Sequence, residues 1–147
     1  MELTGVPNAV ESAKTRRAGM HQLLVELEEA IAAATPGREG AWREQVGASL
    51  NRLSGSFAHH VAATEAPDGL FDQVRRRAPR LDGRCRRLAR DHRSIAEELA
   101  AALAALDGDV EEIRERVLAT LARLARHRQL GADLVYEAYD VDLGGSD

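Results

Sequence analysis

Apolar residues recur at alternating steps of three and four along four long segments of the chain, which is the spacing of a buried helix face. The third segment shows this stripe most clearly, at Leu81, Cys85, Leu88, Ile95, Leu99 and Leu106. The other stripes comprise Met20, Leu24, Leu27 and Ile31; Trp42, Val46, Leu50, Leu53 and Phe57; and Val110, Ile113, Val117, Leu121 and Leu124. The pattern predicts an all-α fold.

Turn and capping residues mark the ends of these segments. Asn8 and Asp109 each precede a glutamate by three residues, which is a helix-capping arrangement, and Pro79 suits a first helical turn. We expect helices at about 8–34, 41–64, 79–106 and 109–139, a short helical linker at about 69–77, and a tail at 140–147. Because the connections are short, these helices should form one up-down-up-down antiparallel four-helix bundle spanning residues 1–147.

Composition narrows the possible functions. A chain of 147 residues has room for one domain, and an aromatic content of 3% argues against a β-sandwich or barrel. The net charge of -4 removes the basic field that nucleic-acid binding needs, and no apolar run approaches the length of a membrane span. Cys85 is the single cysteine and no secretory signal opens the sequence, so we expect a cytoplasmic protein.

Each expected helix carries one histidine on or beside its apolar stripe: His21, His60, His92 and His127. Counting along the helices at about 1.5 Å per residue gives the four histidines heights that differ by at most about 9 Å along the bundle, which is compatible with one shared layer. A single buried histidine can satisfy its nitrogens with a hydroxyl or a carbonyl. Four at one level would cost about 1–3 kcal/mol for each group left unsatisfied, which favours a shared metal ion.

A carboxylate would complete such a site, and Glu65 is the best candidate. A regular helix would turn it about 140° away from His60, but Pro67 ends or distorts the helix and can swing Glu65 inward. His59 points about 100° away from His60 and should lie at the surface. Imidazole ligands suit iron, zinc, copper or nickel, and a carboxylate shifts the preference toward iron or manganese.

The order of these motifs along the chain resembles the order found in the hemerythrin-like family, also called the HHE cation-binding domain. The similarity covers most of the chain and rests on stretches that contain each of the four histidines. These stretches are His21-Gln22-Leu23-Leu24, His60 through Thr64-Glu65 to Gly69-Leu70-Phe71, Asp91-His92-Arg93-Ser94-Ile95 and His127-Arg128-Gln129, together with Pro79-Arg80-Leu81 and the tail from Glu137 to Gly145.

The resemblance implies a four-helix bundle that holds non-haem iron, usually as a di-iron centre that binds O2 or is linked to oxygen, NO, peroxide or iron sensing. By position, His21, His60, His92 and His127 match the family's ligand histidines, and Glu65 matches its carboxylate on the second helix.

The chain also departs from the family pattern. Gly131 and Ala132 stand where the family often has a further acid, and Ala96 where some members have another histidine. A single carboxylate would not balance the positive charge of two iron ions in the interior, so a site with one iron is the alternative to a di-iron centre. Gly131 itself should leave a small void one turn from His127, where water or a diatomic ligand can sit.

We therefore expect a metal-binding protein with iron as the cofactor and a small diatomic molecule or peroxide as the ligand. The second interpretation is a metal-free or zinc-containing helical interaction module, in which the arginines between Arg75 and Arg93 contact an acidic protein partner. The third is a peroxide- or oxygen-reactive di-iron enzyme. Tyr139 lies beyond the histidine layer, and we expect it to cap the end of the bundle; the alternative is a hydrogen-bond donor behind the metal ligands.

Overall fold

The computed structural model describes residues 6–141, which are helical apart from short turns. The four long helices are α1 (Val6–Ala32), α2 (Glu39–Glu65), α4 (Asp82–Ala104) and α5 (Val110–Val135). The shorter elements are α3 (Leu70–Arg77), the 3-10 turn η1 (Pro79–Leu81) and the π-helical turn η2 (Tyr136–Val141).

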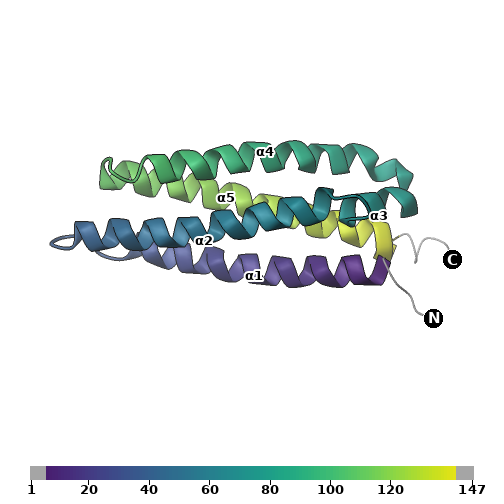
Figure 1. Ribbon diagram of the computed structural model, residues 1–147, viewed down its shortest axis with the longest axis horizontal. Helices are drawn as coiled ribbons and strands as arrows, with labels where there is room; N and C mark the ends of the chain where they lie inside the picture. Colours follow the sequence, from purple (N-terminus) through teal and green to yellow (C-terminus); the bar gives the residue numbers. More distant parts are fainter. Residues whose placement is uncertain (1–5, 142–147) are drawn as a thin grey trace.

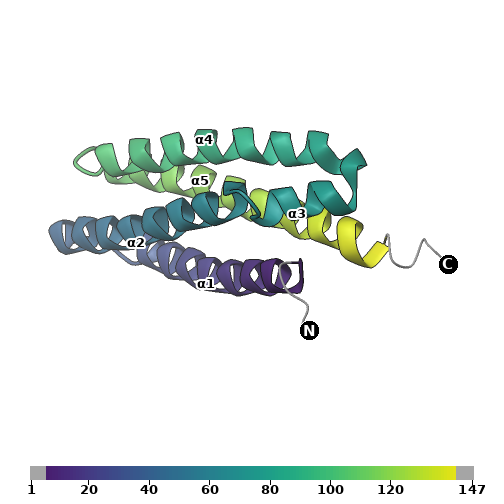
Figure 2. The same ribbon diagram turned by 45° about the vertical axis from the view of Figure 1, so that its right-hand side comes forward.

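The long helices form an antiparallel bundle (Figures 1 and 2). α1 packs against α2, α2 against α4, α4 against α5, and α5 against α1, so the four helices enclose a common interior. The α1–α2 and α4–α5 connections share one end of the bundle, and α3 lies toward the other (Figure 1). The all-α bundle is confirmed, and residues 6–141 contain no strand.

The helix limits follow the expected capping residues only in part. The side chain of Asp109 accepts hydrogen bonds from the amides of Glu111 and Glu112, which confirms the cap of α5. α1 begins at Val6, so Asn8 lies inside the helix rather than before it. α5 gives way to the wider η2 turn at Tyr136, where Ala138 and Tyr139 pack against α3. The part of the expected tail beyond residue 141 lies outside the described residues.

The interior consists of two apolar clusters. The larger occupies the half of the bundle nearer the shared loops and includes Trp42, Leu50 and Phe57. The smaller joins α3 to the start of α4 and the end of α5, and includes buried Tyr139, in keeping with its expected place at the end of the bundle. Within residues 6–141, no helix has the combined length and apolar character that crossing a membrane requires.

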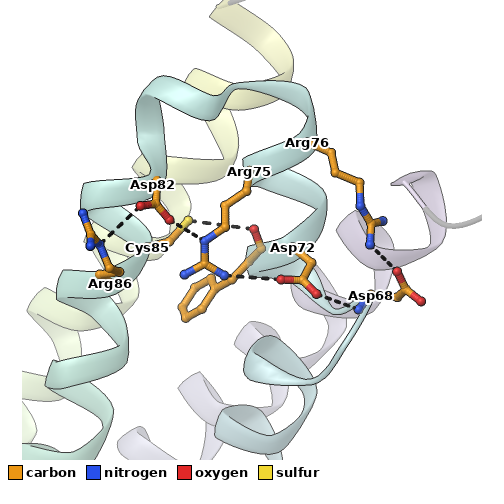
Figure 3. Close-up of polar contacts among 8 residues, drawn as sticks. Asp68, Asp72, Arg75, Arg76, Asp82, Cys85 and Arg86 are labelled. Atoms are coloured by element: carbon orange, nitrogen blue, oxygen red, sulfur yellow. Dashed lines mark hydrogen bonds and ion pairs between the residues drawn. The ribbon is translucent and has the colours of Figure 1, made fainter.

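The turn from α2 into α3 depends on its backbone and on a chain of ion pairs. A Cβ atom on Gly69 would lie 2.4 Å from the carbonyl oxygen of Ala63, so only glycine fits there. Arg76 pairs with Asp68, and the Nε of Arg75 lies 2.7 Å from a carboxylate oxygen of Asp82 (Figure 3). The first pair joins α3 to the turn before it, and the second joins α3 to the first residue of α4, close to the histidines described next.

Candidate metal centre

Three histidines from three different helices meet inside the bundle. They are His60 on α2, His92 on α4 and His127 on α5, and their ring centroids lie 4.8–5.6 Å apart. One nitrogen from each ring can be chosen so that all three lie within 4.8 Å of one another. The expected common level is therefore confirmed for these three residues.

The helical stripe explains why two of these imidazoles are buried. His92 occupies the core position between Leu88 and Ile95 on α4 and is 1% exposed. His127 follows Leu124 by three residues on α5 and is 4% exposed. Leu88 belongs to the smaller apolar cluster and Ile95 to the larger one, so the histidines lie where the two clusters meet.

The structure does not bring His21 into this group, so its expected inward position is wrong. The His21 side chain is exposed on α1, whereas the neighbouring Met20 is buried and lines the cavity beside His60. Successive residues of a helix are rotated by about 100°, and here the rotation turns His21 away from the interior that Met20 faces. His59 is exposed, as expected.

Glu65 does reach the site, but as a partner of a histidine. It is the last residue of α2, and its Oε2 lies 2.5 Å from Nδ1 of His92. Because this contact occupies Nδ1, the free nitrogen of His92 is Nε2, which is buried and has no hydrogen-bond partner among the described residues. Glu65 thus fixes which nitrogen His92 can offer to a metal.

Asp91 performs the same role for His127, and the sequence analysis did not identify it. Its Oδ2 lies 3.1 Å from Nδ1 of His127, and its other carboxylate oxygen accepts a hydrogen bond from Arg123 at 3.1 Å. Arg123 also pairs with Glu98. Asp91 precedes His92 in the sequence but serves a histidine on the neighbouring helix, so only the packing of α4 on α5 reveals the contact.

The three imidazoles are held in the neutral form that binds metals. Burial, together with the proximity of His92 and His127, lowers the pKa of His60 to about 3. Burial also lowers the pKa of His92 and of His127, although Glu65 and Asp91 oppose the shift. For Asp91, burial works to raise the pKa, but the hydrogen bonds from His127 and Arg123 outweigh it and the net shift is downward.

Two phenylalanines surround the rings. Phe57 lies 5.7–6.0 Å from all three imidazole centroids, with its ring steeply inclined to those of His92 and His127. Phe71 on α3 stacks on His92 with 12° between the ring planes and 5.7 Å between the centroids. The ion pair between Arg75 and Asp82 (Figure 3) joins α3, which carries Phe71, to α4, which carries His92.

A cavity of about 30 Å³ opens beside the histidines. This exceeds the roughly 10–15 Å³ that one water molecule needs, so it has room for a water or a diatomic molecule. Besides the three histidines, its lining comprises Ala13, Arg17, Met20, Thr64, Leu70, Phe71, Leu88, Arg128, Gly131 and Leu134. No atom outside the local helix backbone lies within 4 Å of a Cβ built on Gly131, which agrees with the expected void at this residue.

The donor set fits a transition-metal ion. The buried Nε2 of His92 and Nδ1 of His60 have no hydrogen-bond partner among the described residues, and leaving such groups unpaired is costly. Carboxylates on the far nitrogens of His92 and His127 form the arrangement by which proteins orient histidine ligands and raise their basicity. The three histidines, two of them buried and His60 half-buried, could therefore hold a metal ion, and the donor set is imidazole only.

The arginines between Arg75 and Arg93 include several with acidic partners in the chain. Arg75 and Arg86 pair with Asp82, and Arg84 pairs with Glu137. These contacts show that much of this positive charge is balanced within the molecule. An acidic partner at this surface stays an untested expectation.

Comparison with known proteins finds no matching family model, no significant match among curated proteins and no significant match among solved structures. What the structure itself shows is a four-helix protein with a buried cluster of three histidines that could hold a metal ion.

Proposed function

We propose that this chain is a mononuclear metal-binding protein in which His60, His92 and His127 hold one non-haem iron ion. The observation that supports the proposal is the convergence of three neutral imidazoles, two of them oriented by carboxylates, beside a small cavity. The resemblance to the hemerythrin-like family makes iron the first candidate metal. When bound, iron supplies a redox-active centre that accepts a small ligand such as O2, NO or peroxide.

The protein orients the histidine ligands and limits the access of water to them. Glu65 and Asp91 hold His92 and His127 with Nε2 free, while Phe57 and Phe71 cover the rings and keep the surroundings apolar. The cavity limits the ligand to a few atoms. Such a site binds or senses a small molecule without needing a catalytic acid or base.

A single ion is favoured over two by charge. The carboxylates of Glu65 and Asp91 are hydrogen-bonded to imidazole Nδ1 atoms, and the candidate ligand group contains histidines only. Two divalent ions would bring four positive charges into a low-dielectric interior, against two carboxylates that already serve the histidines.

Zinc is the second candidate for the bound metal, because the candidate ligands are three histidines. Three histidines with no carboxylate are a known zinc ligand set, whereas a carboxylate among the ligands would have favoured iron. A zinc-containing or metal-free helical interaction module is the corresponding alternative function.

The test is to purify the full chain from cells supplied with both iron and zinc, and to quantify each metal per chain. We then record the near-ultraviolet and visible spectrum before and after adding O2 or NO. About one iron per chain and a spectral change with NO support the proposal. Two irons with an oxo-bridge band would replace it with a di-iron site, stoichiometric zinc would favour the second candidate, and no metal would favour the interaction module.

A further inference from the structure

Two arginines line the cavity and a third adjoins one of them, and the metal site does not use any of the three. Arg17 on α1 and Arg128 on α5 line the cavity, and Arg16 adjoins Arg17 on the same helix. All three are partly buried. We call them the arginine cluster.

No described acidic side chain pairs with the arginine cluster. Neither an ion pair nor a hydrogen bond joins any of its side chains to another of residues 6–141. On a helix, a pairing acid would stand three or four residues away. The residues at those positions are Ser12, Ala13, Lys14, Gly19, Met20 and His21 on α1, and Leu124, Ala125, Gly131 and Ala132 on α5.

The buried nitrogens of the cluster point to a missing acceptor. Nε of Arg16 and Nε of Arg128 are shielded from solvent and have no hydrogen-bond partner within the described part of the chain. Burial lowers the pKa of Arg16, and burial followed by the charges of Arg128 and Arg16 lowers the pKa of Arg17. Partly buried positive charges that lie close together are unfavourable unless an anion joins them.

We infer that the arginine cluster binds a small planar oxyanion between α1 and α5, at the mouth of the cavity. The planar guanidinium group donates two parallel hydrogen bonds to a two-oxygen anion, which makes a carboxylate-like group the matching ligand. The cavity of about 30 Å³ restricts the anion to a few atoms, the size of formate, nitrite or hydrogen carbonate. The inference does not depend on a metal, because no member of the cluster belongs to the candidate ligand group.

The test uses the full chain after treatment with a chelator. Sodium formate is titrated into it by calorimetry at low ionic strength, with sodium chloride as the comparison salt. We expect saturable binding of one formate per chain. Arg17→Gln and Arg128→Gln should each weaken binding by about tenfold to a hundredfold, because each removes charged hydrogen bonds to the anion.

Arg126→Gln is the matched control. Arg126 lies on the same helix as Arg128, is exposed and does not line the cavity, so its loss changes the net charge equally but should leave binding unchanged. Arg128→Lys keeps the charge without the planar fork and should weaken formate binding several-fold. Circular dichroism identifies any variant that fails to fold, in which case Arg128→Lys carries the test.

Several results would overturn the inference. These are the absence of saturable formate binding, equal losses in Arg126→Gln and Arg128→Gln, or tighter binding of phosphate than of formate. Binding that appears only after zinc loading and disappears in His92→Ala would place the anion on the metal instead. A chain that takes up no metal but still binds formate would refute the proposed function and leave the arginine cluster intact as an anion site.

Discussion

Oε2 of Glu65 lies 2.5 Å from Nδ1 of His92, a contact that joins the last residue of α2 to the centre of α4. It places a carboxylate behind the imidazole and leaves the other ring nitrogen facing its two partner histidines. The contact also ties together two helices that are linked in the chain only through α3 and η1.

The first prediction concerns the ligands themselves. His92→Ala should lower the metal content and affinity roughly tenfold or more, since it removes one of three donors. His59→Ala and His21→Ala should bind metal like the wild type, because both side chains are exposed outside the cluster. Metal per chain after dialysis against a weak chelator measures the effect. Equal losses in all three variants would show that the three-histidine assignment is wrong.

The second prediction concerns the carboxylates behind the ligands. Glu65→Gln and Asp91→Asn should each weaken metal binding by about tenfold to a hundredfold, because a neutral amide is a weaker acceptor for the ring N–H and does not raise the basicity of the imidazole as a carboxylate does. Both variants should still fold. Chelator competition gives the affinities, and Glu97→Gln, at an exposed position of α4, serves as the control. Unchanged affinity in both variants would mean that the two carboxylates do not support the metal.

The third prediction is that the metal-free protein loses stability in mild acid. His60, His92 and His127 have pKa values below the ordinary 6.5, so below pH 6.5 the unfolded chain takes up protons that the folded chain does not. As the pH falls below 6.5, the free energy of unfolding should decrease by about 1.4 kcal/mol per pH unit for each imidazole that stays neutral in the folded chain.

Urea unfolding at several pH values between 7.5 and 5 measures this slope before most carboxylates titrate. His59→Ala should keep the wild-type slope, whereas His60→Gln should reduce it by the contribution of one proton. A stability that stays level or rises on acidification would contradict the neutral, buried state of the cluster.

The fourth prediction separates two effects of Gly131. Gly131→Ala should stabilise the protein by about 0.5–1 kcal/mol, because glycine costs that much inside a helix and a Cβ at this position meets no neighbour within 4 Å. Gly131→Leu should fill the cavity and weaken NO binding to the iron-loaded protein. Thermal unfolding and NO titration read out the two effects. Unimpaired NO binding in Gly131→Leu would show that the ligand does not use this cavity.

The helices could be read from the sequence because their signals are local. The alternation of apolar residues along α4 identifies its buried face, and the Asp109 cap identifies where α5 begins. His92 and His127 were correctly placed in the interior because each occupies a position of an apolar stripe. His21 was misplaced because it stands at the flank of its stripe: α1 buries the stripe residue Met20 and leaves the flanking His21 exposed.

The partners of the histidines depend on contacts between helices. Asp91 and His127 are 36 residues apart, and Glu65 and His92 are 27 residues apart, so no periodicity within one helix predicts either pair. The arginine cluster likewise arises only when α1 packs on α5. Local spacing was enough to establish the helices and the two buried imidazoles. Which ring nitrogens remain free was decided by the rotation and axial offset of the packed helices. Rotation and offset depend on the packing of the whole interior, which no local signal contains.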